Sequence, residues 1–334
     1  MTLTPEQALE QAALAGIHCL RIPTPFAVGR VNCYLLEDKP LTLIDTGPNS
    51  GKALDELQSQ LGERGLSIDD LELVIVTHQH IDHLGLVEIV AQHSGAEVAA
   101  IGAAAERLAN FNEDAEREDA FAVELMLRNG IPEEVARALQ SVSRSFRGWG
   151  SRAQVSRPLA DGEDIEFRDR TLTALHRPGH SPSDTVFWDE ERRILIAADH
   201  LIAHISSNPL ITRPLDGSDR RTQALVTYIE SMRRTREMPA EIVLSGHGEP
   251  ITDHVALIDD RLAKHERRKE KIHRLIAERP RTGYELAQAI WGNVAVTQAF
   301  LTLSEVIGHA DLLVNEGRVR EVHDGMVIRY ETSG

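Results

Sequence analysis

The sequence predicts an α/β protein in which two β-rich halves form a four-layer αβ/βα sandwich with helices on both outer faces. Short apolar and β-branched runs separated by turn residues fill residues 17–100, and the pattern returns in residues 154–260. Stretches with helical spacing accompany these runs. Residues that can bind metal ions follow several predicted strands directly, and binding sites are common at strand ends. One rim of the sandwich is therefore the expected functional site.

Each half follows from the order of its apolar runs. In the first half we expect strands over residues 17–22, 31–36, 41–44 and 97–100, and helices over residues 52–61 and 86–93. In the second half we expect strands near Ile165, Leu172, Val186, Ile194 and Ile242. Together these elements form the predicted α/β sandwich.

An insert of about residues 103–152 separates the two halves. Its runs at 121–127 and 135–139 have helical periodicity. After residue 260 the strand-like apolar runs give way to a charged stretch. We therefore predict a first domain over residues 1–260 that contains the insert, and a second domain over residues 261–334.

The C-terminal part is predicted to begin with a charged helix and to end in a hairpin. The expected elements are helices over residues 259–278, 283–291 and 298–315, and strands over residues 318–322 and 326–330. Asp324 and Gly325 stand between the two β-runs, and Asp-Gly is a strong hairpin signal. Helices followed by a hairpin resemble a winged-helix domain.

The run from Thr77 to His83 reads Thr-His-Gln-His-Ile-Asp-His and follows the apolar run 73–76. Imidazole nitrogen and carboxylate oxygen are common ligands of Zn²⁺ and related metals. His78 and His80 alternate at a strand end, while Asp82 and His83 turn back as a helix begins. This arrangement suits two adjacent metal ions better than one.

Three further candidate ligands lie downstream, each at the end of a predicted strand. They are His180 in a Pro-Gly-His-Ser turn, Asp199 after the run 194–198, and His247 in Gly-His-Gly. Small neighbouring residues permit tight turns and close backbone approach. Each is weak evidence alone, but all three repeat the same design of strand, ligand and turn.

With Asp45-Thr46-Gly47 after an early strand, these motifs resemble those of the metallo-β-lactamase fold superfamily of hydrolases, especially its dinuclear, glyoxalase II-like branch. The resemblance covers about residues 15–260 and includes the fold. It implies a first metal held by His78, His80 and His180, a second held by Asp82, His83 and His247, and Asp199 as the bridge. It also implies that Asp45 orients a ligand without binding metal.

The implied ligand set predicts a hydrolase that uses a metal-bridging hydroxide. Two Zn²⁺ ions ~3.5–4 Å apart, with Mn or Fe as alternatives, would lower the pKa of a bridging water toward ~7. Asp82 is expected both to bind metal and to orient the hydroxide. His200 is a candidate catalytic donor, with a structural role as the alternative. Arg177, Arg213 and His204 are weaker anion-binding candidates.

Two relatives within the superfamily fit the sequence less well. Dinuclear β-lactamases usually have Cys where this chain has Asp199, and its only cysteines, Cys19 and Cys33, lie far from every motif. Persulfide dioxygenases of this fold bind one iron, whereas the complete seven-ligand set favours two metals. A small-molecule ester or thioester is therefore the expected substrate.

Helical insertions at this point often cover the metal site in the superfamily. One interpretation of the insert is a lid, and the alternative is packing against the sandwich. The side chains that would line an apolar channel under such a lid are Phe111, Phe121, Met126, Phe146 and Trp149.

Composition is typical of a globular enzyme, with 42% hydrophobic and 26% charged residues. The polar N-terminus does not resemble a signal peptide, and no apolar run approaches the ~20 residues of a membrane helix. Two cysteines do not form a disulfide framework. We therefore expect a cytoplasmic protein with no membrane partner.

The charge distribution argues against nucleic acid as a partner. The net charge is −16, and residues 282–317 contain no Lys or Arg, although nucleic-acid binding depends on such residues. The apolar residues of the predicted helix 298–315 indicate packing or a homodimer contact. The charged helix before them is the one basic element, and its interleaved Glu residues indicate a solvated face.

Three hypotheses remain. The first is a dinuclear metal hydrolase of small-molecule esters or thioesters. The second is a metal-dependent endoribonuclease of single-stranded RNA that uses the basic helix. The third is a binding or regulatory module dominated by the C-terminal domain. The acidic charge favours the first.

Overall fold

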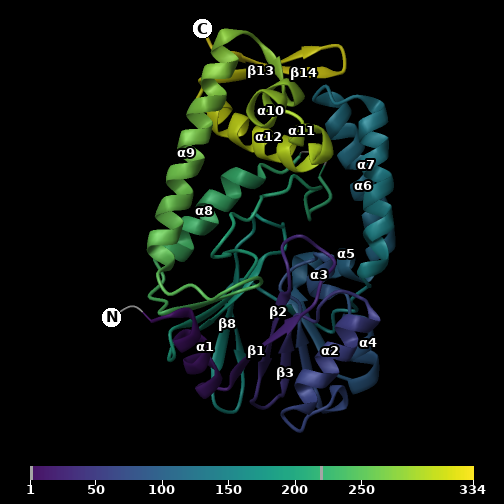
Figure 1. Ribbon diagram of the computed structural model, residues 1–334, viewed down its shortest axis with the longest axis vertical. Coiled ribbons are helices and arrows are strands. Elements are labelled where there is room, and N and C mark those ends of the chain that lie inside the picture. Colours follow the sequence, from purple (N-terminus) through teal and green to yellow (C-terminus); the bar gives the residue numbers. More distant parts are fainter. Residues whose placement is uncertain (1–2, 219–220) are drawn as a thin grey trace.

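The computed structural model describes residues 3–218 and 221–334, with the backbone alone at positions 295 and 297. Two β-sheets form its lower half in Figure 1. The first sheet has the order β1 (Ile17–Ile22), β2 (Val31–Leu36), β3 (Thr42–Ile44), β4 (Leu73–Ile75), β5 (Glu97–Ile101) and β6 (Arg157–Leu159). The second has the order β11 (Ile242–Ser245), β10 (Ile194–Ala198), β9 (Thr185–Asp189), β8 (Thr171–His176) and β7 (Glu163–Glu166). Every strand expected from the sequence is present.

The strand pairing explains where the helices lie. β1, β2 and β3 pair antiparallel, whereas β3, β4 and β5 pair parallel and need crossovers. The crossovers carry the helices α2 (Gly51–Gly62), α3 (Ile81–Leu84) and α4 (Val87–Ser94). In the second sheet, β10 and β11 pair parallel across α8 (Ala224–Arg236).

Three apolar clusters separate the four layers. The central cluster joins the two sheets, with Tyr34 and Ile44 from the first and Phe187 and Leu244 from the second. A second cluster joins the first sheet to α2 and α4, and a third joins the second sheet to α8. The short helix α1 (Pro5–Leu14), capped by Thr4, also packs against the central cluster. The expected αβ/βα sandwich is thus present.

The helical insert contains α5 (Ala105–Ala109), α6 (Phe111–Arg128) and α7 (Glu133–Phe146), and α6 and α7 form a long hairpin that extends from the sandwich toward the C-terminal helices (Figure 1). Phe111 packs against the core of the first half. Phe121 and Met126 instead join an apolar cluster with residues of α8 and α12 (Ala299–Asn315). The insert thus packs on the C-terminal helices as well as on the sandwich, which neither interpretation of the sequence included.

The C-terminal part has its own small core. It contains α9 (His254–Glu278), β12 (Arg281–Thr282), α10 (Gly283–Trp291), α11 (Val294–Thr297), α12, β13 (Val319–Asp324) and β14 (Val327–Thr332). Thr282 and Glu285 form a capping box at the start of α10. The hairpin turn follows Asp324, and Gly325 has a φ of 62°, in the left-handed region. Apolar side chains of α12 are buried, which favours packing over a homodimer contact.

The sandwich and the C-terminal part are joined by a helix and by a hydrogen bond. α9 runs from the sandwich to the C-terminal core along one side of the molecule (Figure 1). The Tyr284 N–H donates to the Asn129 carbonyl at 3.0 Å, where the insert meets α10. Among the described residues, no helix combines the length and apolar character needed to cross a membrane.

Candidate metal centre

The candidate ligands gather at one rim because each follows the carboxyl end of a strand. The loop after β4 carries His78 and His80 and leads into α3, which carries Asp82 and His83. The β8–β9 loop carries His180, while Asp199 and His247 follow β10 and β11. All seven residues predicted as metal ligands therefore lie at this rim.

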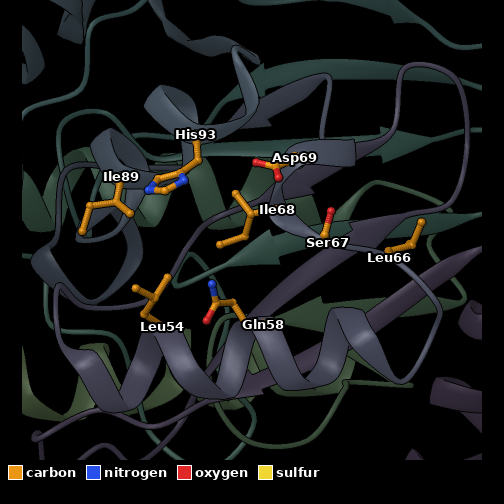
Figure 2. A pocket seen from close by; sticks show the side chains of 8 residues that line it. All are labelled: Leu54, Gln58, Leu66, Ser67, Ile68, Asp69, Ile89 and His93. Atoms are coloured by element: carbon orange, nitrogen blue, oxygen red, sulfur yellow. The ribbon is translucent and has the colours of Figure 1, made fainter.

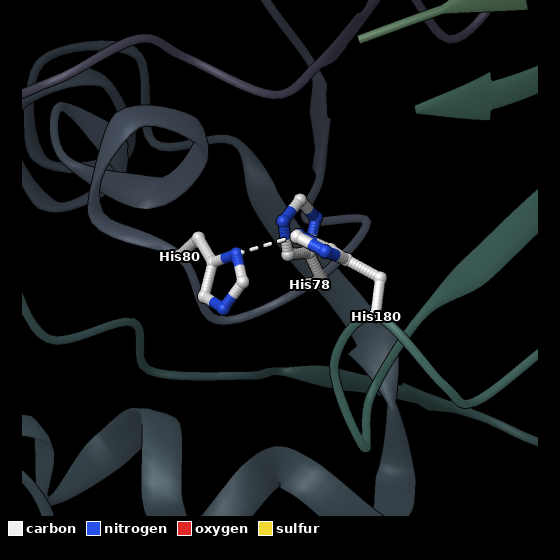
Figure 3. Close-up of side chains that lie close together, drawn as sticks. All are labelled: His78, His80 and His180. Carbon is white, nitrogen blue, oxygen red and sulfur yellow. Dashed lines mark hydrogen bonds between the residues drawn. The ribbon is translucent and has the colours of Figure 1, made fainter. Parts of the chain in front are cut away.

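Three histidines form a first group. The His80 Nδ1 and His180 Nε2 atoms are 2.9 Å apart, as the dashed line in Figure 3 marks. The ring of His78 is edge-on to both, with centroid distances of 4.7 Å to His80 and 5.4 Å to His180. One ligand atom from each of the three residues lies within 4.8 Å of the other two, so the group can enclose one metal ion.

Asp82, His83 and His247 form a second group with the same 4.8 Å limit. His247 Nε2 lies 3.3 Å from Asp82 Oδ2. Asp199 lies between the two groups: its carboxylate oxygens are 3.5 Å from His180 Nε2, 3.4 Å from His83 Nε2 and 3.6 Å from His247 Nε2. A single carboxylate thus faces both groups.

Hydrogen bonds fix which nitrogen each histidine presents to this space. His83 Nδ1 donates to Asp45 Oδ2 at 2.7 Å, and His247 Nδ1 donates to the Arg30 carbonyl at 2.9 Å. His180 Nδ1 likewise faces the Asn208 carbonyl at 3.2 Å. Since carbonyl and carboxylate oxygens only accept, each Nδ1 carries a proton and each Nε2 is the nitrogen turned toward the candidate metal centre.

His78 reaches the same state through Thr77. The Thr77 hydroxyl donates to Asp45 Oδ2 at 2.8 Å, so its oxygen accepts from His78 Nδ1 at 2.9 Å. The Thr77 N–H also donates to Asp45 Oδ1, at 2.9 Å. Asp45 therefore orients His83 directly and His78 through Thr77, which is the kind of supporting contact expected of it.

The buried atoms that face one another here lack ordinary partners. Nε2 of His78, His83 and His247 and Oδ1 of Asp199 are buried without a hydrogen-bond partner. Buried polar atoms are almost always paired, and leaving one unpaired costs ~1–3 kcal/mol. Lone pairs of imidazole and carboxylate converging on one space are the donor set of a divalent transition metal, so the residues present fit such ions.

Electrostatics at the rim also favours positive charge. Burial would raise the pKa of Asp199, but His83 and His247 hold it well below its usual range. Burial lowers the pKa of His80 to about 3, and neighbouring His180 adds to this effect. Burial lowers the pKa of His78 as well. The carboxylate is thus ionised and these two imidazoles are neutral, which are the forms that bind metal.

The other predicted functional residues lie in different surroundings. The ring of His200 is buried against Tyr228, and its Nε2 meets Thr235 Oγ1 at 2.9 Å, on the side of α8. This placement favours the structural alternative for His200. Arg177 donates to the neighbouring His176 carbonyl, and Arg213 pairs with Asp114 of α6 at 3.1 Å.

Two supporting features were missed from the sequence. The side-chain oxygen of Gln79 accepts from the hydroxyls of Ser181 and Ser183, which joins the His78–His80 loop to the His180 loop. No helix begins at these serines, since a turn leads directly into β9. At Gly246 a Cβ atom would lie 2.2 Å from Asp199 Oδ1, so only glycine leaves room for this carboxylate.

The chain is similar to proteins of one family. Residues 27–247 match the family described as the Metallo-beta-lactamase superfamily. The chain is 33% identical over 321 residues to the Probable metallo-hydrolase YqjP of Bacillus subtilis, covering 94% of this chain and 97% of that one. It is also similar to the crystal structure of the metallo-beta-lactamase family protein TTHA1429 from Thermus thermophilus, with a TM-score of 0.77, 27% identity, and coverage of 96% and 100%.

A shorter similarity involves a protein named for its activity. The chain is 35% identical over 134 residues to the Acyl-coenzyme A thioesterase MBLAC2 of Bos taurus. This match covers 38% of the chain and 40% of the bovine protein. It therefore describes a part of each protein, not the whole.

Proposed function

Because the chain belongs to the metallo-beta-lactamase superfamily, we propose that it is a dinuclear metal-dependent hydrolase whose substrate is a small-molecule thioester or ester. The observation that carries the proposal is the position of Asp199. Its carboxylate faces His180 of one group and His83 and His247 of the other. A carboxylate that faces imidazole nitrogens of both groups is suited to bridge two ions.

We assign seven ligands to the two ions. His78, His80 and His180 would hold one, Asp82, His83 and His247 the other, and Asp199 both. Two divalent ions bound there would supply a nucleophilic hydroxide near neutral pH and polarise the carbonyl oxygen of the substrate. Zn²⁺ fits this nitrogen-rich set, and Mn or Fe are alternatives.

The side chains of the chain have separate tasks in this reaction. Asp82 has one carboxylate oxygen beside His247 Nε2, and its carboxylate is the acceptor we assign to orient the attacking water. Four partners accept from Nδ1 of His78, His83, His180 and His247, which turns Nε2 of these rings toward the ions; the partners are Thr77, Asp45, Asn208 and Arg30. Water adds to the carbonyl carbon, the C–S or C–O bond breaks, and the thiol or alcohol leaves with a proton.

A thioester is favoured by chemistry and by similarity. A thiolate is a good leaving group, so a thioester needs no further acid catalyst near the metals, and His200 is not positioned as one. The thioesterase name of the bovine relative supports the same class. We also propose that the chain is close to the glyoxalase II-like branch and that α10, α12 and the hairpin form a winged-helix domain.

A second candidate is an endoribonuclease, because α9 is basic: between Lys264 and Arg274 it has six Lys or Arg and two Glu. The rest of the C-terminal helices opposes it, because residues 282–317 contain no Lys or Arg. RNA binding would therefore rest on one helix in a protein of net charge −16.

The test is a hydrolysis screen on protein of measured metal content. The substrates are an acyl thioester, a lactone, a β-lactam, a phosphodiester and single-stranded RNA, each with and without a chelator. We expect two metal ions per chain and chelator-sensitive hydrolysis of the thioester first. One ion per chain, or RNA cleavage without thioester cleavage, would overturn the proposal.

A further inference from the structure

A cavity of about 310 Å³ lies between the sandwich and the C-terminal helices. On one side it is lined by the segment 206–208, which follows Asp199. On the other side it is lined by residues of α9, α10 and α12, including Lys264, Arg268, Trp291 and Leu301. The cavity therefore exists only where the two parts of the chain meet.

One wall of this cavity is part of the candidate metal centre. The Asn208 carbonyl accepts from His180 Nδ1 at 3.2 Å, and the Ser207 hydroxyl donates to the Asp199 carbonyl. The Asn208 side chain in turn donates to the Leu301 carbonyl at 3.1 Å. A molecule in the cavity would thus contact the same segment that supports two candidate ligands.

A second cavity does not share this connection. It has a volume of about 230 Å³ and lies between α2 and α4, in the outer helical layer of the first half (Figure 2). Its lining residues, which include Gln58, Asp69 and His93, comprise none of the candidate ligands. None of these lining residues belongs to the candidate metal centre or to the segment 206–208.

The first cavity is locally basic in an acidic protein. Lys264 and Arg268 both line it, whereas Glu305 is its one acidic lining residue. Lys264 is paired only with Asp260, one turn earlier and exposed, and such pairs are weak. Arg268 pairs with Glu305 at 2.9 Å and lies 5.1 Å from the centre of the Trp291 ring, which leaves several of its donors free.

Two residues that line this cavity also carry unpartnered polar atoms. His265 lines the cavity, is 6% exposed, and its buried Nε2 has no hydrogen-bond partner. The side-chain oxygen of Asn208 is buried without a partner as well. The cavity therefore offers two cations for an anion, polar atoms for amide groups and an apolar surface from Trp291 and Leu301.

We propose that this cavity binds the phosphopantetheine arm of a thioester substrate, an inference that rests on the proposed hydrolase function. The arm joins a phosphate, two amides and a short apolar chain to the reacting thioester. Lys264 and Arg268 bind the phosphate, and Asn208 and His265 face the amides. Trp291 and Leu301 cover the chain, and the thioester end points along the 206–208 segment toward Asp199.

The first test compares substrates that share an acyl group. Hexanoyl-coenzyme A carries the phosphorylated arm, whereas hexanoyl-N-acetylcysteamine has the thioester without the phosphate. We expect KM to be about 10-fold or more lower for the coenzyme A ester, and to rise with salt for that ester alone, because charge-assisted contacts to phosphate are lost or screened. Equal KM values would overturn the inference while leaving the hydrolase intact, and failure to cleave either ester would overturn the hydrolase itself.

The second test uses matched charge variants of α9. Lys264→Gln and Arg268→Gln remove cavity cations, and Lys271→Gln removes an exposed cation of the same helix that does not line the cavity. We expect the first two to raise KM for hexanoyl-coenzyme A about 10-fold and leave hexanoyl-N-acetylcysteamine turnover unchanged. The same KM for all three variants would contradict the proposal.

A binding readout separates this role from metal chemistry. Calorimetry with coenzyme A on chelator-treated protein should show binding that Lys264→Gln weakens about 10-fold and Lys271→Gln does not. The source of the arm is resolved by comparing hexanoyl-coenzyme A with a hexanoylated acyl carrier protein, and either source supports the site. Tighter binding of single-stranded RNA than of coenzyme A, weakened by the same variants, would reject it.

Discussion

Two clusters of buried and half-buried histidines lie in different charge environments. At the rim, His80 Nδ1 and His180 Nε2 are 2.9 Å apart, and in the C-terminal part His265 Nδ1 and His309 Nε2 are 3.3 Å apart. Each cluster has a carboxylate nearby, and each could be taken for a metal site on distance alone. The difference is in what surrounds the imidazoles.

The rim histidines are surrounded by carboxylates. Asp45, Asp82 and Asp199 all contact them, and these negative charges favour a bound cation. At the second cluster the carboxylate of Glu305 is already paired with Arg268, and Lys269 lies close enough to His309 to lower its pKa. We infer from this comparison that the charge around a histidine pair, more than its spacing, distinguishes a candidate cation site from a basic cavity wall.

The largest expected effect comes from removing the shared carboxylate. Asp199→Ala should reduce thioester turnover by at least about 1000-fold and bring bound metal below one ion per chain, because both groups lose a ligand. Metal content is measured by emission spectroscopy alongside activity. Asp164→Ala, an exposed change on β7, is the control and should keep both. Full metal content in Asp199→Ala would show that this residue does not bridge the groups.

The supporting carboxylate should matter less. Asp45→Asn keeps the size of the side chain but presents a weaker acceptor to His83 Nδ1 and Thr77, and loss of such contacts typically costs 10–100-fold in metal affinity. Competition with a coloured chelator gives the affinity. Wild-type affinity in this variant would mean that the backbone alone orients His83.

The second cluster should behave in the opposite way. His309→Ala should leave the number of bound metal ions unchanged and lower the free energy of unfolding by about 1–3 kcal/mol, because a fully buried side chain is lost from α12. His273→Ala, on the more exposed side of α9, is the control. Loss of one metal ion per chain in His309→Ala would show that the second cluster also binds metal.

The smallest effect is a pH dependence of stability. Burial lowers the pKa of His265 and His309 to about 4, and the Arg268 guanidinium adds to this at both. Between pH 6.5 and 4 these histidines are protonated in the unfolded chain but stay neutral in the folded protein. The free energy of unfolding therefore falls over this range and levels off below pH 4. The double variant His265→Gln, His309→Gln should lose roughly 2 kcal/mol less unfolding free energy between these two pH values than the wild type. Denaturant titrations at each pH measure this difference. An unchanged slope would mean that neither imidazole is buried as a neutral group.

Much of the sandwich could be predicted because its signals are local. Strands such as β1 and β2 are apolar runs bounded by turn residues, and the observed bounds match the expected ones. The seven candidate ligands could be chosen for the same reason, since each follows such a run. The packing of Met126 against α12 and the contacts of Gln79 with Ser181 and Ser183 could not be predicted, because they depend on which distant segments meet in space.

His200 shows the limit of reasoning from neighbours in sequence. It follows Asp199, but successive side chains near a strand end point to opposite sides, and its ring enters the core beside Tyr228. The cavity between the two parts was also beyond prediction, because its walls come from segments more than fifty residues apart.

The apolar cluster that α6 shares with α12 has a consequence for synthesis of the chain. Val123 and Met126 of α6 are made long before Ala299, Leu303 and Ile307 of α12, which cover them. During translation the apolar face of the α6–α7 hairpin therefore stays uncovered until α12 has left the ribosome. Until then this hairpin exposes apolar surface, and we expect a fragment that ends before α12 to aggregate.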